Sequence, residues 1–248
     1  MRQSVILLLI SLLLTGCKSC KDKTDGNVII HVHATFGNQP LSFVNTFYND
    51  GAGKEYFFSK LKFYLSHVQL IRTDNTPVPL TDAAYIDWSD EAWKKFIGKA
   101  DAGTYKGLRF FVGLDKQQNS LKPDDYDADH PLGPKDEMFW EWLGYRFINF
   151  EGRADTAGQN FTGGSVGLVY HVGRDTCYRE VTLSGAEFTV QNSGKKAIRL
   201  NLDLMKIFTG TDAINAFQYP GTQSEDYDLH IAIRFADRFA QSFDYTPL

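Results

Sequence analysis

The chain has 248 residues, of which 43% are hydrophobic, 14% aromatic and 23% charged. This composition excludes a collagen-like or broadly disordered protein, and the supply of aromatic side chains is enough for a sizeable core. Lys and Arg number 26 against 30 Asp and Glu, which gives a net charge of −4. Without a basic excess to neutralise phosphates, we expect no general nucleic-acid binding. Three Cys residues are too few for a disulfide-stapled mini-fold.

The first residues predict export followed by lipidation. Arg2 supplies a positive start, and an apolar run over residues 5–14 follows. This run is too short to span a hydrocarbon core of ~30 Å, and it has the proportions of a signal peptide. The sequence Leu14-Thr15-Gly16-Cys17 matches a bacterial lipobox. We therefore expect residues 1–16 to be a signal peptide and Cys17 to carry a lipid anchor in a cell-envelope membrane, periplasmic or at the cell surface. The alternative is an ordinary secretory signal that is cut near Gly16.

The region after the expected cleavage site divides into a tether and a body. Residues 17–26 are polar and offer nothing to a core, which is typical of a tether. Residues 27–248 show no repeat and no linker, so we expect one domain. Cys20 and Cys177 are the remaining thiols in an oxidising compartment. They could pair and staple the tether to the domain, or both could stay unpaired.

The sequence of residues 27–248 predicts a mostly β structure. Short helices are expected only at 89–97, 203–208 and 212–217. Many short strands with glycine-rich turns predict a two-sheet antiparallel β-sandwich, immunoglobulin-like or similar; a barrel with a ligand cavity is the alternative. The expected strands cover residues 28–36, 41–48, 62–72, 103–114, 146–150, 165–171, 178–183, 187–190, 197–202 and 228–235.

One long irregular segment, residues 115–137, leads directly into an aromatic cluster at residues 138–142. Loops of this length are often functional. Trp140 and Trp142 in the cluster could be core residues, or they could stack on sugars.

The same segment carries alternating carboxylates. Asp125, Asp127 and Asp129 have the spacing of a calcium loop, with Asp136 at the twelfth position. His130 stands where such a loop needs Gly, so a solvated acidic loop is the alternative to calcium.

Histidine residues are the strongest metal-ligand candidates. His31 and His33 are two residues apart on an expected strand, so both imidazoles point to one face. Neutral imidazoles suit copper and zinc, although a half-exposed polar pair is the alternative. His171 ends another expected strand, whereas His67 and His230 are expected mid-strand as hydrogen-bonded core residues. No assembled catalytic set is present, so we do not expect an enzyme.

Several ordered segments together resemble the MbnP-like family of copper-binding proteins encoded near methanobactin or copper-acquisition systems. The similarity runs over about residues 28–210, and many members of this family are lipoproteins. The segments that carry it are 62–68 (KFYLSHV), 102–105 (AGTY), 113–115 (GLD), 131–132 (PL), 138–147 (MFWEWLGYRF), 151–152 (EG) and 170–173 (YHVG).

The resemblance implies a β-rich protein outside the cytoplasm. In characterised members, His nitrogens and a Trp oxidised to kynurenine by a partner di-haem enzyme (the MbnH type) hold Cu(I). Carried over by residue, His171 is the metal-binding His, and Trp140 or Trp142 is the modified position. Copper-binding members have a His after the glycine of the aromatic motif, where this chain has Tyr145. A phenol is a poor Cu(I) ligand, so the copper site in this chain is expected to be altered or absent.

Two functions therefore stand against each other. The first is a copper-binding lipoprotein that captures or hands on copper through His171, His31 and His33 beside Trp140 or Trp142. The second is a surface lipoprotein without a metal role, which binds a glycan or another partner through residues 115–142.

Overall fold

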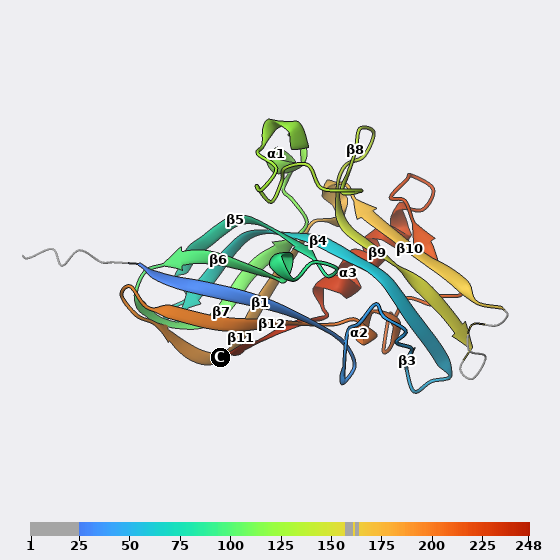
Figure 1. Ribbon diagram of the computed structural model, residues 1–248, viewed down its shortest axis with the longest axis horizontal. Coiled ribbons are helices and arrows are strands. Elements are labelled where there is room, and N and C mark those ends of the chain that lie inside the picture. The colour runs from blue at the N-terminus through green and yellow to red at the C-terminus, as the bar shows by residue number, and fades with distance from the viewer. Residues whose placement is uncertain (1–24, 157–160, 162–163) are drawn as a thin grey trace, which may run out of the picture.

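The computed structural model describes residues 25–156, 161 and 164–248. The expected signal peptide, Cys17 and Cys20 lie outside these residues. Two β-sheets pack face to face, and an aromatic core fills the space between them (Figure 1).

The smaller sheet has five strands. Its order is β14–β12–β1–β2, and β6 also pairs with β1. Burial alternates strictly along β1, with even-numbered residues buried in the core and odd-numbered residues on the outer face. The bounds are β1 (Gly26–Phe36), β2 (Gln39–Pro40), β6 (Lys95–Ala100), β12 (Lys195–Asp203) and β14 (Phe243–Pro247).

The larger sheet has nine strands in the order β11–β7–β4–β9–β10–β13, with β3 and β5 pairing with β4 and β8 pairing with β9. Its longest strand, β4, pairs with β5, β7 and β9 along different parts of its length. The bounds are β3 (Tyr48–Asn49), β4 (Lys54–Arg72), β5 (Pro77–Asp87), β7 (Gly103–Val112), β8 (Phe139–Trp140), β9 (Gly144–Thr156), β10 (Val166–Gly173), β11 (Arg179–Val190) and β13 (Gly221–Thr222).

Helices are short and peripheral except for α3. This helix packs Phe235 and Phe239 onto the inner face of the larger sheet, where Phe235 stacks on Tyr170 with 4.2 Å between ring centroids. None of the helices in the described residues is long and apolar enough to cross a membrane. The helical segments are η1 (Glu91–Lys94), α1 (Lys116–Asn119), η2 (Pro123–Asp125), η3 (Asp175–Cys177), α2 (Met205–Phe208) and α3 (Leu229–Ala240).

The predicted sandwich is confirmed, and both of its sheets are mixed rather than purely antiparallel. Parallel pairing joins β1 to β12 and β10 to β13. The predicted strand at 228–235 is wrong, because this segment belongs to α3. Its buried residues Ala232, Phe235, Ala236 and Phe239 follow the helical spacing of three and four.

Other elements differ in extent from the sequence prediction. The predicted strand at 41–48 is irregular up to Tyr48, whose hydroxyl accepts a hydrogen bond from the Ser42 amide at 2.6 Å. The predicted helix at 89–97 divides into η1 and the strand β6, and 212–217 forms turns without a helix. The two strands expected at 178–183 and 187–190 are one strand, β11, with a register shift between Ser184 and Phe188.

Candidate functional site

The candidate site lies on the outer face of the nine-stranded sheet, beneath the segment that carries α1 and β8. Figure 1 shows this segment rising from one face of the sheet beside β9 and β10. Tyr170 and Val172 of β10 are buried core residues, so the alternation of the strand places His171 between them on the opposite face. The long loop predicted from the sequence therefore delivers its aromatic residues to this part of the sheet.

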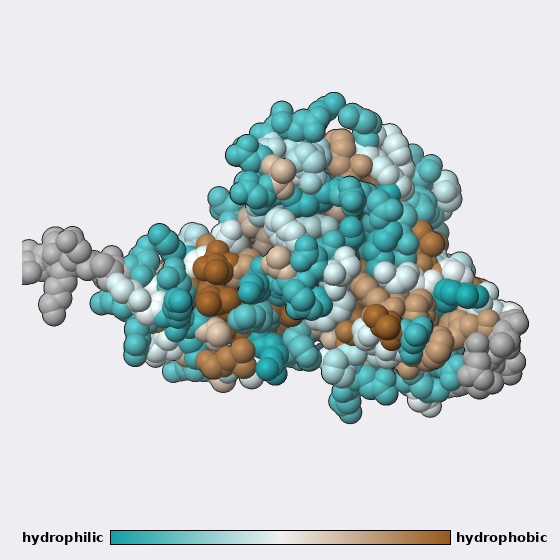
Figure 2. Space-filling view, viewed as in Figure 1, coloured by the Kyte–Doolittle hydropathy of each residue, from teal (hydrophilic) through white to brown (hydrophobic). Residues whose placement is uncertain are grey.

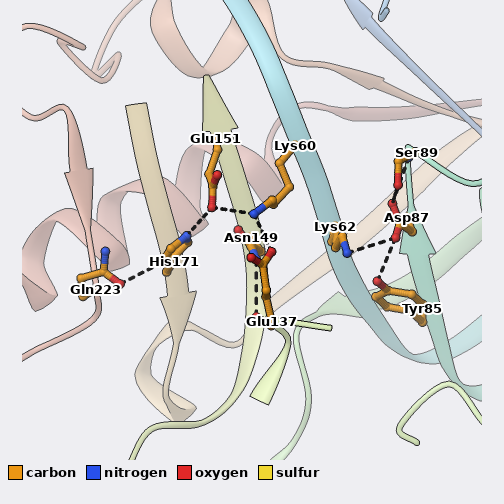
Figure 3. Close-up of polar contacts among 10 residues, drawn as sticks. All are labelled: Lys60, Lys62, Tyr85, Asp87, Ser89, Glu137, Asn149, Glu151, His171 and Gln223. Carbon is orange, nitrogen blue, oxygen red and sulfur yellow. Dashed lines mark hydrogen bonds and ion pairs between the residues drawn. The ribbon is translucent and has the colours of Figure 1, made fainter. Parts of the chain in front are cut away.

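His171 is held at both ring nitrogens (Figure 3). Its Nε2 lies 2.9 Å from Glu151 Oε1, and its Nδ1 lies 2.8 Å from Gln223 Oε1. The residue is only 8% exposed. A carboxylate only accepts, so the Nε2 atom donates to Glu151, while the Gln223 amide can present an acceptor or a donor to Nδ1. The imidazole is thus oriented by polar contacts rather than enclosed in apolar packing.

A polar row crosses four neighbouring strands from His171. The register pairs His171 with Asn149, Asn149 with Lys62, and Lys62 with Asp87. Directly opposite residues share one face of a sheet, so these side chains line up beneath the covering loop. Lys62 Nζ lies 3.3 Å from Asp87 Oδ2, and Tyr85 and Ser89 also donate to Asp87 (Figure 3).

A second set of charges borders this row. Lys60 Nζ donates to Glu151 Oε1 at 2.9 Å and also pairs with Glu137. Burial alone would raise the pKa of Glu151, but hydrogen bonds from His171 and Lys60 outweigh it and hold that pKa below its usual value. Glu151 therefore stays a carboxylate that faces both a cation and the imidazole.

Trp140 is enclosed by three different groups. The Arg146 guanidinium lies 3.3 Å from the centroid of its ring, and the Trp142 indole stacks on it with centroids 5.1 Å apart. The His171 imidazole meets Trp140 edge-on at 5.6 Å. Arg146 is 3% exposed, and its burial lowers the pKa of the guanidinium to about 10. Trp142 is 55% exposed, so the two stacked indoles extend from the protein surface to His171.

His31 and His33 do not join this cluster. Both lie on the outer face of β1 in the smaller sheet, where they border a hollow with Trp88 and Lys94. Burial and the Arg199 guanidinium lower the pKa of His33. The described residues contain no group of three His, Cys, Asp or Glu that could hold a metal ion. The expected convergence of these two imidazoles with His171 is therefore not found.

The acidic loop is likewise not assembled around a metal. Asp125, Asp127 and Asp129 line an open hollow with Tyr126 and His130, and within the part of the chain described no three carboxylates gather for a cation. Asp125 instead accepts from the Lys122 backbone amide at 3.0 Å. His130 stacks on Tyr126 with ring centroids 4.4 Å apart.

Sequence patterns do not identify the residues around His171 and Trp140. Glu151 and Arg146 enter only as parts of motifs, and Lys60 and Gln223 lie in none of these motifs. Lys60 on β4 and Glu151 on β9 give a weak signal, since a charged residue inside a strongly apolar strand marks a covered polar face. His67 forms a further pair outside this cluster, with its Nε2 2.7 Å from Asp115 Oδ2.

Cys177 is buried and makes no disulfide within the described residues. Burial raises the pKa of its thiol to about 11. Its expected alternative partner, Cys20, lies outside those residues.

Comparisons with known proteins place this geometry in a family context. The model of the MbnP family matches residues 25–224. A solved structure, MbnP from Methylosinus trichosporium, superimposes with a TM-score of 0.58 at 15% sequence identity, and the match covers 90% of this chain and 99% of that one. At this identity the likeness shows a shared fold. No curated protein matches the sequence.

Proposed function

Because the chain belongs to the MbnP family, we propose that it is a non-enzymatic lipoprotein of the cell envelope that binds copper at His171, beside Trp140, and hands it on. The lipobox ending in Cys17 supports the anchor. The observation that carries the site is the edge-on contact between the His171 imidazole and the Trp140 indole.

The donor set differs from three converging imidazoles. His171 offers copper its Nε2 once the hydrogen bond to Glu151 is released, and Glu151 offers a carboxylate. Cu(I) prefers imidazole or sulfur ligands over carboxylates, so this site supplies one strongly preferred donor. Lys60 and the stacked Arg146 add positive charge, which opposes a bound cation. We therefore expect weak Cu(I) binding while the indoles are intact.

Oxidation of an indole to kynurenine would supply the missing donors. Kynurenine carries an aromatic amine and a ketone, and a partner di-haem enzyme would perform the oxidation. The exposed Trp142 stacked on Trp140 makes the pair accessible from the surface. Copper affinity should then depend on whether the partner enzyme has oxidised the indole.

Cu(I) affinity, measured by competition with a colorimetric chelator, tests this function. We expect His171→Ala to weaken binding by at least about tenfold, because removing even an outer hydrogen-bond partner of a metal ligand costs about 10–100-fold in affinity. His230→Ala is the matched control, because His230 is exposed on α3. Equal affinity of wild type and His171→Ala would remove His171 from the site.

Mass spectrometry of the natively expressed protein addresses the modification and the anchor separately. A Trp peptide that gains two oxygens and loses one carbon monoxide would identify kynurenine. An acyl-modified peptide beginning at Cys17 would support the anchor, and an unmodified mature N-terminus would contradict it.

A second function rests on the exposed loop. The free face of Trp142 and the open hollows beside the Tyr126–His130 stack suit binding of a glycan or another partner. Loss of ligand binding in Trp142→Ala, with Cu(I) affinity unchanged, would favour this reading over copper handling.

A further inference from the structure

The outer face of the five-stranded sheet carries an apolar row between two cationic rows. The register sets Ile97, Ile29 and Ala197 side by side across β6, β1 and β12. On one side of this row, Lys95 and Arg199 flank His31. On the other side, Lys99 and Lys195 flank Asn27. We call these nine residues the basic face.

The side chains of the basic face stand free of the core. Ile97 is 60% exposed, which is unusual for an isoleucine in the middle of a strand. Lys95, Lys99, Lys195 and Arg199 are all exposed. Figure 2 shows a compact hydrophobic area surrounded by hydrophilic atoms over the region where Figure 1 places β6.

The charge of the basic face opposes that of the whole chain, which is −4. Within residues 25–156, 161 and 164–248, none of its four Lys and Arg side chains forms an ion pair. The nearby acids lie at its margins. Glu91, which lines a hollow with His31 and Lys95, is paired with Lys94. Asp101 is paired with Arg72, and Asp25 precedes β1. Lys196 donates to the backbone oxygen of Leu248 at 2.7 Å.

At the far end of the sheet the outer surface turns more acidic. Asp203 accepts from the Gly37 and Met205 amides, and Asp244 accepts from Asn201. The four cations of the basic face are therefore gathered at the end of the sheet where β1 begins.

Chain length ties this end to the expected anchor. β1 begins at Gly26, nine residues after Cys17. A fully extended chain of that length spans about 30 Å at most. If Cys17 carries the lipid, the basic face starts within that distance of the membrane.

We propose that the basic face docks onto an anionic phospholipid surface, with Ile97 and Ile29 entering the headgroup layer and the Lys and Arg side chains contacting lipid phosphates. This inference rests on the lipid anchor of the proposed function. The aliphatic stems of Lys and Arg cover apolar surface while their charged ends stay in the polar headgroup layer. An apolar row between two cationic rows fits this arrangement. Docking would hold the domain flat on the membrane and leave the Trp140–His171 cluster, on the opposite sheet, turned to the aqueous side.

A second copy of the chain is a poorer occupant. An isologous contact would set the same four cations against their own copies, and like charges across an interface are repulsive. An anionic lipid layer supplies the complementary charge instead.

Lysine footprinting of the full-length processed protein tests the proposal. The protein is placed in vesicles of phosphatidylcholine alone, or of phosphatidylcholine with phosphatidylglycerol, and acetylated briefly. Mass spectrometry then compares Lys95 and Lys99 with Lys116 and Lys206, which are exposed elsewhere. We expect several-fold lower acetylation of Lys95 and Lys99 in anionic vesicles only, with recovery at high salt.

Charge-reversal variants sharpen the comparison. Lys95→Glu combined with Lys99→Glu should abolish the salt-dependent protection of Lys195, whereas Lys116→Glu combined with Lys206→Glu makes the same change in net charge and should leave it intact. Equal labelling in both kinds of vesicle would overturn the proposal. So would protection without vesicles that grows with protein concentration, since that would identify a second copy.

The experiments distinguish failure of the lipid-anchor proposal from failure of the membrane-docking proposal. If the mature N-terminus carries no acyl chain, the lipoprotein proposal fails, and the basic face is then judged by whether the protein co-sediments with anionic vesicles in low salt. If the protein is acylated and Lys95 labels equally in both vesicle types, only the docking proposal fails.

Discussion

The imidazole of His171 meets the indole of Trp140 edge-on, with 5.6 Å between ring centroids and 83° between ring planes. His171 lies on β10 and Trp140 on β8, and both strands pair with β9. The strand between them supplies Arg146 to the face of the indole and Glu151 to the imidazole. A single strand thus places a cation and an anion on the two aromatic rings.

Arg146 should be important for stability because its guanidinium is buried against Trp140. We expect Arg146→Ala to lower the free energy of unfolding by about 2 kcal/mol or more, the size of a desolvated cation–π contact. Arg146→Lys should recover only part of this, because an ammonium lacks the planar stacking surface. Chemical denaturation followed by Trp fluorescence gives both values. Arg199→Ala, at an exposed position of β12, should change stability by less than about 0.5 kcal/mol.

Asp87 should make the fold sensitive to acid. Burial would raise the pKa of this carboxyl, but hydrogen bonds from Ser89 and the charge of Lys62 outweigh it and lower that pKa below the usual 3.8. A group whose pKa is lowered by folding stabilises the folded state above its unfolded pKa. This stabilisation is lost as the pH falls through the folded value. Stability should therefore drop below about pH 4.

The test is a set of unfolding curves at several acidic pH values. Asp87→Asn should be less stable than wild type near neutral pH, and its stability should fall less steeply in acid. Asp82→Asn changes an exposed carboxyl on the same strand and should follow the wild-type curve. An Asp87→Asn curve parallel to wild type would remove Asp87 as the cause.

Loss of the hydroxyl group should change the stability differently at two buried tyrosines beneath the covering loop. The Tyr145 hydroxyl donates to the Leu132 carbonyl at 2.6 Å, whereas the buried Tyr64 hydroxyl has no hydrogen-bond partner among the residues that the structure describes. We expect Tyr145→Phe to destabilise by about 1 kcal/mol or more, because it leaves a buried carbonyl unpaired. Tyr64→Phe removes an unsatisfied group and should be neutral or stabilising. Thermal unfolding of the two variants side by side measures the difference, and a clear loss in Tyr64→Phe would show that its hydroxyl has a partner after all.

Local patterns predicted those parts of the fold that repeat with a short period. The alternation in β1 is visible in the sequence, so that strand and the shared face of His31 and His33 were predicted correctly. Residues 228–235 alternate almost as well, but the segment is helical. Its apolar positions continue with helical spacing to Phe239, and packing against Phe63 and Tyr170 decides its conformation.

The site was harder to predict because sheet order decides it. His31 and His171 look equivalent as strand histidines, yet the parallel pairing of β1 with β12 places His31 in the other sheet. The neighbours of His171 come from β9 and from Gln223 next to β13, and nothing in local spacing links them. The proximity of His171 to Trp140 was expected only from the family resemblance.

His67 offers a test of backbone strain inside a strand. It has a φ of +46° in the middle of β4, next to the register shift between Val68 and Gln69 that marks a bulge. A side chain with a β-carbon is disfavoured in this left-handed conformation, and glycine is not. The His67–Asp115 contact at 2.7 Å offsets part of this strain.

His67→Gly should therefore lose the contact with Asp115 but relieve the backbone strain, whereas His67→Val should lose the contact and keep the strain. We expect the valine variant to unfold at least about 1 kcal/mol more easily than the glycine variant. Urea unfolding of the two variants measures this difference directly, and because neither can bond to Asp115, equal stability would mean that the strand relaxes to an unstrained backbone at this position.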